Sequence, residues 1–171
     1  MELNELLTAR YSVRKFSDRP VEQEKLELVL RASQAAPTAH NNQPQRILVL
    51  RSPEAKEKGE RCTPFHFGEP LLLVISYDVE SAWHRELDGK NHGEIDAAIA
   101  AAQMMLRAAD LGLGTTYIGV FDPEALKREF PAELAGCQPI ALMPLGYPAE
   151  TAHPSRLHGE RKPLEETVRY L

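Results

Sequence analysis

Two arginines and a serine alternate near the start of the chain, at Arg10, Ser12 and Arg14. If this stretch is helical, the two arginines share a face, and if it is extended, all three residues do. Guanidinium groups and a hydroxyl that converge on one spot are suited to bind a phosphate or a planar anion. Lys15 and Arg19 extend the basic cluster in a chain whose formal net charge is −5. So short a motif also fits a solvated basic turn at the end of a first helix, and taken alone it does not decide between the two.

A second group of polar residues fills the stretch from Thr38 to Pro44, directly after a predicted helix. Pro37 ends that helix because proline cannot continue the hydrogen-bond ladder. The loop contains threonine, histidine, asparagine and glutamine, whose side chains bond to nearby backbone or to a ligand. We therefore expect a polar loop that is available for binding.

Several other kinds of site are disfavoured. The pair Gly112 and Gly114 has Tyr117 where a dinucleotide-binding motif needs its third glycine, and it closes a helix instead of opening one. The six histidines lack the spacing of a zinc site, so we expect no metal. Neither Cys62 nor Cys137 has a context that would activate a thiol. An enzyme without such groups takes its reactivity from a cofactor.

The elements that must position these residues are predicted from hydrophobic periodicity and from the prolines. Helices are expected over residues 2–10, 22–36, 53–61, 94–111 and 122–130, with a last helical turn from Pro163; strands are expected over 47–50, 71–77, 115–119 and 138–145. Residues 78–93 are expected to form a loop or a short helix, and residues 149–162 to be irregular. Left-handed conformations at Gly112 and Gly114 are expected to end the helix over 94–111.

The helix over 94–111 is apolar nearly all round. Such a helix must be covered on every side, which a small domain hardly achieves alone. We therefore expect a subunit interface on one side, where the alanines allow two helices to approach closely. The alternative is a central helix that its own domain wraps completely.

Length and composition indicate one globular domain. The chain has 171 residues, of which 43% are hydrophobic and 26% charged. The acidic balance argues against a nucleic-acid binder. Two distant cysteines and an N-terminus without a secretion signal fit the cytoplasm. The longest apolar run, Leu71–Ile75, is too short to span a bilayer.

Five segments, in this order along the chain, resemble motifs of the nitroreductase family of FMN-dependent oxidoreductases. They are Arg10–Arg14, Pro37–Pro44, Leu111–Gly119, Pro144–Pro148 and Arg161–Glu166. The second matches a Pro-Ser-x-x-Asn-x-Gln-Pro pattern, with Thr38 in place of the serine. The resemblance covers nearly the whole chain. It implies an α+β fold in which a mixed or mostly antiparallel sheet of four or five strands is flanked by helices and completed by homodimerisation.

The resemblance also implies that FMN lies at the interface of a homodimer and that both subunits build each site. By motif, Arg10 and Ser12 would face the phosphate and ribityl chain, and Arg14 the pyrimidine edge, where a cation stabilises the reduced flavin. The loop would come from the other subunit, Tyr117–Gly119 would lie along one flavin face, and Arg161 would close on the phosphate. The predicted cofactor-binding residues are Arg10, Tyr11, Ser12, Arg14, Pro37, Thr38, Ala39, His40, Asn41, Gln43, Tyr117, Ile118, Gly119, Arg161 and Lys162, with no catalytic side chain.

The sequence departs from the family pattern at the mouth of the site. Larger members carry an asparagine and a lysine before the central strand that touch the flavin, and the stretch Cys62–Phe67 has neither. His66 is a candidate replacement. His40 and Asn42 fill variable positions of the loop, and residues 78–93 are the one candidate cover of the pocket.

The function expected from the resemblance is an NAD(P)H oxidoreductase. NAD(P)H would deliver hydride to FMN, leave, and be replaced by an electron-poor acceptor such as a nitroaromatic or a quinone. One alternative is an enzyme of the same fold that uses reduced flavin and oxygen to break down the flavin itself. Another is a flavin-binding protein with little turnover, used as a sensor or carrier.

Overall fold

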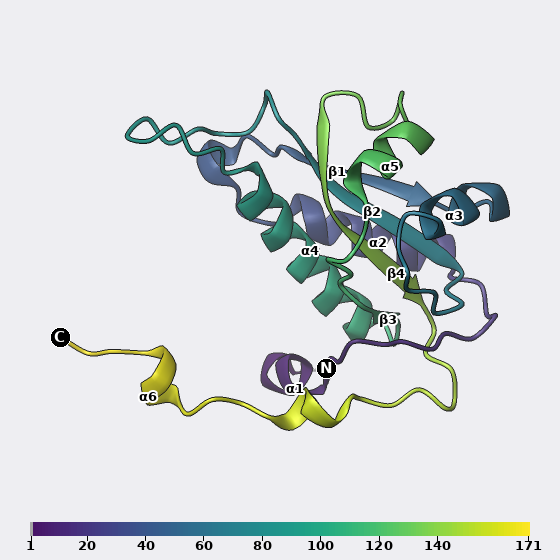
Figure 1. The fold of residues 1–171 in the computed structure, drawn as a ribbon. Coiled ribbons are helices and arrows are strands. Elements are labelled where there is room, and N and C mark those ends of the chain that lie inside the picture. Colours follow the sequence, from purple (N-terminus) through teal and green to yellow (C-terminus); the bar gives the residue numbers. More distant parts are fainter. Residues whose placement is uncertain (1) are drawn as a thin grey trace.

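A four-stranded antiparallel sheet forms the centre of the molecule (Figure 1). The computed structural model describes residues 2–171. Its strands are β1 (Gln45–Leu50), β2 (Leu71–Asp78), β3 (Gly114–Thr115) and β4 (Cys137–Gly146), in the spatial order β1-β2-β4-β3. The α+β class and the mostly antiparallel sheet are thereby confirmed.

Strand β2 is buried on both faces, as its unbroken apolar run predicts. Successive side chains of a strand point to opposite faces, so Leu71, Leu73 and Ile75 belong to one core and Leu72 and Val74 to the other. The first core includes residues of α2 (Gln23–Gln34) and α4 (Gly93–Asp110), and the second includes residues of α3 (Pro53–Glu60) and α5 (Pro123–Glu129). The sheet therefore lies between two helical layers.

The predicted helices are all present, with ends that differ by a residue or two. The remaining helices are α1 (Leu3–Ala9) and α6 (Leu164–Thr167), and two 3-10 turns are η1 (Ala39–Asn41) and η2 (Arg156–Gly159). Helix α5 begins as predicted, because Asp122 accepts a hydrogen bond from the Ala125 N–H at 2.9 Å and Pro123 occupies the first turn. At the end of α4, Gly112 has the expected left-handed φ of 75°, whereas Gly114 lies in β3.

The prediction of one continuous strand over 115–119 is wrong, because the strand is interrupted. Thr115 pairs with Leu145, and in the same register Ile118 exchanges two backbone hydrogen bonds with Leu142. Thr116 would pair with Pro144 in between, but proline has no N–H to donate to the ladder. Strand β3 therefore stops at Thr115, and the next two residues leave the sheet.

Helix α4 is covered on one side by its own domain. Ala97, Ala101, Met104 and Ala108 are buried in the core beside β2 and α2. On the other side Ile95 and Ile99 are exposed, so the domain does not wrap the helix completely. The expected uncovered apolar face is present, and dimerisation through it stays a prediction.

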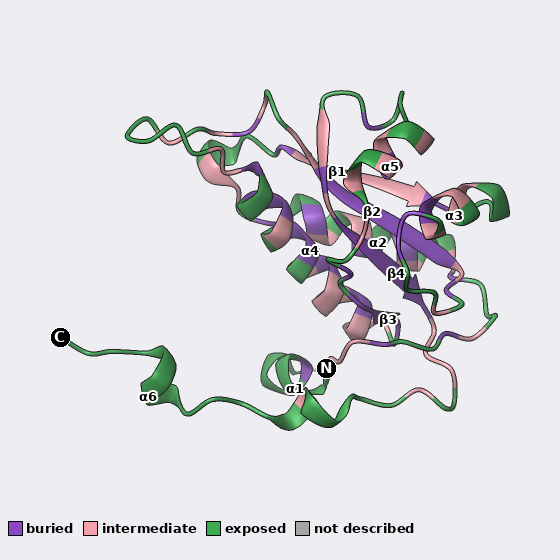
Figure 2. Cartoon of the chain, viewed as in Figure 1, coloured by how far each residue is buried: buried purple, intermediate pink, exposed green. Residues whose placement is uncertain are grey.

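The C-terminal part of the chain is an exposed arm (Figure 2). Residues 149–162 are irregular apart from η2, as expected. From η2 the chain runs away from the sheet through α6 to its C-terminus (Figure 1). Apolar side chains on this arm, among them Leu164 and Tyr170, are exposed.

None of the helices within residues 2–171 combines the length and the hydrophobicity that crossing a bilayer requires.

Candidate functional site

The motif from Arg10 to Arg14 is extended, which decides between the two conformations left open by its sequence. The Val13 N–H donates a 2.9 Å hydrogen bond to the Thr115 carbonyl, and Ser12 forms a parallel bridge with Thr115. Val13 is buried against Gly114, where a Cβ atom would lie 2.5 Å from the Val13 side chain. The motif is therefore held along the end of the sheet by backbone bonds and by a contact that only glycine permits.

The two arginines of the motif line different clefts, so the expectation that they converge on one spot is wrong. Arg10 and Tyr11 line a cleft of about 160 Å³ together with Gly112–Thr115. Arg14 lines another, of about 180 Å³, together with Tyr117–Gly119. Four residues of extended chain separate their Cα atoms by about 13 Å, and the two side chains border separate clefts.

The cleft at Arg14 brings two of the predicted binding segments together. Arg14 donates to the Ser12 carbonyl at 3.3 Å, and Tyr117, 41% exposed, borders the same cleft. In the described part of the chain, no atom lies within 4 Å of where a Cβ would stand on Gly119, so a flat ligand can approach its backbone. Burial, followed by the charge of Glu94, raises the pKa of the Tyr117 phenol and favours its neutral form.

Two aromatic residues of this cleft were not predicted. Phe65 and Phe67 line it, with their rings stacked at 6.1 Å between centroids and an interplanar angle of 12°. His66 lies between them, is exposed, and is not among the lining residues, so the suggestion that it replaces a flavin contact finds no support. The sequence did contain a signal for them, because two aromatic residues with one residue between them can point to the same side of an extended chain.

The loop from Pro37 to Gln43 lies at the other end of the molecule from β3. Figure 1 shows η1 beside the N-terminal end of α4, whereas β3 lies beside its C-terminal end. The Ala39 N–H donates to the carboxylate of Asp96, a residue of α4 that is 3% exposed, at 3.1 Å. Within one chain, this loop is therefore not part of the cleft at Arg14.

The backbone of this loop is strained. His40, Asn41 and Gln43 have φ values of 52°, 55° and 51°, in the left-handed region that costs non-glycine residues energy. Such strain persists where surrounding contacts enforce it, and it clusters at ligand-binding sites. The Gln43 N–H donates to Thr38 Oγ1 at 3.1 Å, which holds the two ends of the loop together.

Residues 79–92 pack on this loop. The His40 ring stacks on Trp83 at 5.3 Å, and Trp83 in turn meets His92 edge-on at 4.8 Å. Asn42 Nδ2 also donates to the Ser81 carbonyl at 3.0 Å. The segment considered as a cover therefore supports the loop, a contact that sequence spacing alone does not reveal.

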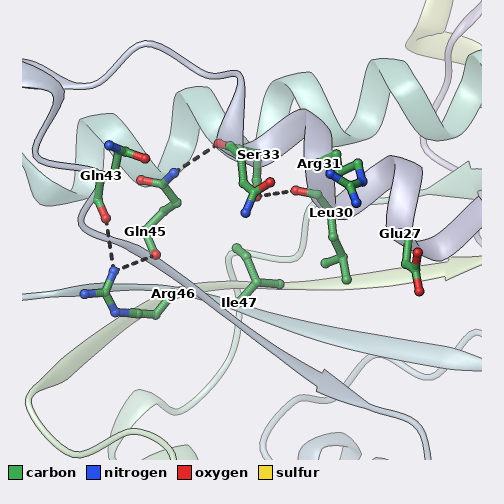
Figure 3. A pocket seen from close by; sticks show the side chains of 9 residues that line it. Glu27, Leu30, Arg31, Ser33, Gln43, Gln45, Arg46 and Ile47 are labelled. Atoms are coloured by element: carbon green, nitrogen blue, oxygen red, sulfur yellow. Dashed lines mark hydrogen bonds between the residues drawn. The ribbon is translucent and has the colours of Figure 1, made fainter.

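A polar groove of about 500 Å³ runs between α2 and the edge strand β1 (Figure 3). Gln43 lines it, and its carbonyl accepts a hydrogen bond from Arg46 at 3.0 Å. Gln45 donates to the Ser33 carbonyl at 3.0 Å across the groove. Gln43 is the one predicted cofactor-binding residue that lines this groove, and neither Arg10 nor Arg14 does.

The C-terminal candidates lie on the exposed arm. Arg161 donates to the carbonyls of His158 and Glu160 at 2.6 and 2.8 Å, and Lys162 lies 3.8 Å from Glu166. His158 meets the Thr8 carbonyl at 3.1 Å and the Tyr11 ring edge-on. The arm therefore starts beside the opening motif, at the end of the molecule that contains Arg10.

No metal centre is found within residues 2–171, where no three histidine, cysteine, aspartate or glutamate side chains group as metal ligands.

The family model of the nitroreductase family matches residues 7–62 and 58–147. The chain belongs to the nitroreductase family. A nitroreductase family protein of Clostridium difficile has the same fold, with a TM-score of 0.91 and 36% identity over 99% of this chain and 98% of that one. A protein of Exiguobacterium sibiricum solved in complex with FMN has a TM-score of 0.85 at 19% identity over 100% and 98% of the two chains, which shows likeness of fold.

Curated relatives of this nitroreductase-family chain align over most of its length. An FMN reductase (NAD(P)H) of Bacillus subtilis is 29% identical over 97% of this chain and 74% of its own. An NADH dehydrogenase of Thermus thermophilus is 29% identical over 93% of this chain and 91% of its own. The five ordered motifs thus led to the correct family.

Proposed function

We propose that this chain is an FMN-dependent NAD(P)H oxidoreductase that acts as a homodimer and passes electrons to an electron-poor acceptor such as a nitroaromatic or a quinone. The observation that supports this most is the cleft in which Arg14 stands beside Tyr117–Gly119. These segments lie far apart in the sequence, and each was assigned to the flavin by motif. The names of relatives that are FMN and NAD(P)H enzymes point to the same cofactors.

The residues present fit FMN. When bound, FMN accepts two electrons and one proton as hydride from NAD(P)H, which leaves as NAD(P)⁺, and the reduced ring carries one negative charge. Arg14 supplies a permanent cation for that charge, and the open backbone at Gly119 lets a flat ring approach. Charge-assisted hydrogen bonds of this kind contribute roughly 1.5–3 kcal/mol each.

The phosphate of FMN would be held at the end of the molecule that contains Arg10. Arg10 and Ser12 belong to the extended motif there, and the arm that bears Arg161 and Lys162 begins at the same place, through the contact of His158 with Thr8. Cationic side chains that approach from two directions suit a dianionic phosphate.

A second copy of the chain would complete the site. A groove of about 590 Å³ follows the exposed face of α4 and is lined mainly by apolar residues, with Ile95, Ala98, Ile99 and Ala102 among them. Exposed apolar surface of this kind marks an interaction site. No residue of the loop from Pro37 to Gln43 lines the Arg14 cleft in its own chain, which fits a loop that serves the partner's flavin.

Two further expectations belong to the same proposal. The two cysteines are free thiols, as expected in a reducing cytoplasm. All of the described elements contribute to one sheet and its helical layers, or to the arm that leaves it, so we propose a single domain over residues 1–171.

Anaerobic titration of the FMN-loaded protein tests this function. NADH or NADPH should bleach the flavin absorbance, and a quinone such as menadione should restore it fully. Bound FMN that neither nucleotide reduces would contradict the oxidoreductase and favour a binding protein. Loss of flavin absorbance that requires oxygen and does not recover would instead identify a flavin-consuming enzyme.

A further inference from the structure

The stretch before β2 is held rigidly against the cleft at Arg14. Thr63 Oγ1 donates to the Val120 carbonyl at 2.7 Å and accepts the Phe65 N–H at 3.3 Å. Further along, the Phe67 N–H donates to the Glu69 carboxylate at 3.3 Å, and the Phe67 carbonyl accepts the Phe16 N–H at 3.2 Å. The backbone that carries Phe65 and Phe67 is therefore tethered at both ends.

Glu69 supports this stretch from inside the protein. It is 2% exposed, and burial is the main cause that raises the pKa of its carboxyl group. A buried carboxylate is retained where it makes hydrogen bonds, and Glu69 makes one to the backbone of Phe67. The stretch before β2 is thus held in part by the buried hydrogen bond between the Phe67 N–H and Glu69.

The anchored stretch presents two aromatic rings to the cleft. Phe65 and Phe67 line it beside Arg14, and Phe65 is 43% exposed. When a flat ligand covers an exposed aromatic ring that borders a cleft, burial of the ring lowers the free energy of the complex. Among the residues that the structure describes, Arg14 is the one charged side chain that lines this cleft. In the single chain Arg14 is exposed, so a bound ligand would have to cover it.

Apolar surroundings change what one cation contributes. The interaction between two charges grows as the effective dielectric constant falls, and water between them screens it. A preorganised charge in a water-excluded site therefore stabilises an opposite charge far better than the same group in solvent. Because Phe65 lines the same cleft as Arg14, a flavin bound against its ring would leave less room for water beside the guanidinium.

We propose that Phe65, supported by Phe67, is a positioning residue that keeps water away from Arg14 in the flavin site, so that one guanidinium stabilises the negative charge of the reduced flavin. The proposal rests on the proposed function and specifies how the same site sets the flavin potential. Phe65 acts through Arg14 and takes no part in the transfer of hydride.

The test is the midpoint potential of bound FMN, measured at saturating FMN. Phe65→Ala should weaken the binding of reduced FMN about tenfold more than that of oxidised FMN, a shift of about 30 mV to more negative potential. Phe65→Leu, which keeps most of the apolar volume, should retain the wild-type potential. Leu28→Ala, at a site on α2 that is 37% exposed and outside the cleft, is the distant control. Phe65→Ser is a second variant if Phe65→Ala does not fold.

A double-mutant cycle separates this role from simple packing. In an Arg14→Ala background, Phe65→Ala should cause no further shift, because no cation is left to shield. An unchanged potential in Phe65→Ala, or the same shift with and without Arg14, overturns the inference while leaving the oxidoreductase intact. A wild-type chain that binds no FMN overturns the proposed function and this inference together.

Discussion

Arg10 and Arg14 belong to one short motif, yet they line different clefts, and we propose that they have different tasks. In an extended chain their side chains share a side of the strand but stand about 13 Å apart. Arg10 borders the cleft at Gly112–Thr115, and Arg14 the cleft at Tyr117–Gly119. Under the proposed function, Arg10 would serve the phosphate and Arg14 the ring of the same cofactor.

Replacing each arginine should therefore damage the protein in a different way. Arg10→Ala removes a contact that is equal in both redox states, so it should weaken FMN binding by roughly 1.5–3 kcal/mol, about 10- to 150-fold, with little change in potential. Arg14→Ala removes a cation that stabilises the negative charge which the flavin gains on reduction. It should lower the flavin potential and slow reduction by NAD(P)H even at saturating FMN, as stopped-flow measurements would show.

Added FMN distinguishes the two variants. It should restore turnover to Arg10→Ala but not to Arg14→Ala. If it restores both fully, Arg14 only anchors the cofactor and the division of roles within the motif is wrong.

At this scale, sequence patterns predicted part of the candidate site. Arg14 and Tyr117–Gly119 were assigned by motif, and the structure brings them into one cleft. Phe65 and Trp83 were missed as neighbours of Arg14 and His40, because the path of an irregular stretch depends on hydrogen bonds such as that of Thr63 to Val120. No local pattern encodes such a contact.

At the scale of the elements, one proline shapes the site. Because Pro144 cannot donate to the ladder, Thr116 and Tyr117 leave the sheet between Thr115 and Ile118. Both residues then line the cleft at Arg14. The apolar runs and the prolines predicted where the elements lie, but the register that sets Pro144 opposite Thr116 arises from tertiary pairing and could not be deduced.

A glycine links β3 to the opening motif and can be tested. A Cβ atom at Gly114 would stand 2.5 Å from the Val13 side chain, so Gly114→Ala must displace the motif or strain the strand. Overpacking of this kind costs about 1–3 kcal/mol, which chemical denaturation would measure, and FMN binding should weaken as well. Gly159→Ala is the matched control, since no described atom lies within 4 Å of its Cβ. Equal stability of the two variants would show that the close packing is not needed.

At the scale of the whole molecule, two uncovered surfaces favour a dimer. They are the apolar face of α4 and the exposed C-terminal arm, and neither finds a cover within its own chain. The proposed dimer would also account for the absence of the strained loop at His40 from the cleft at Arg14, because a partner subunit would bring its loop to the flavin. The single-chain fold and the uncovered face of α4 could be predicted from sequence, whereas the arrangement of two subunits stays a prediction.

A charge on the exposed face of α4 should separate the subunits. Ile99→Glu would bury a carboxylate in an apolar interface, at a cost that the dimer cannot offset. We expect a folded monomer, with half the mass of the wild-type dimer, that has lost its FMN. Light scattering would measure the mass, and flavin absorbance the bound FMN. Leu87→Glu, at an exposed site outside the α4 groove, should keep the mass and the FMN content of the wild-type protein. A dimeric Ile99→Glu protein that retains FMN would place the interface elsewhere.

Sedimentation velocity of the wild-type protein, followed in the visible absorption band of the flavin, tests whether two chains share the FMN sites. After incubation with FMN and removal of the excess, we expect one coloured boundary at twice the chain mass, with one FMN per chain. Protein that sediments without colour would contradict the flavin site. A coloured boundary at the mass of a single chain would contradict the site shared between subunits.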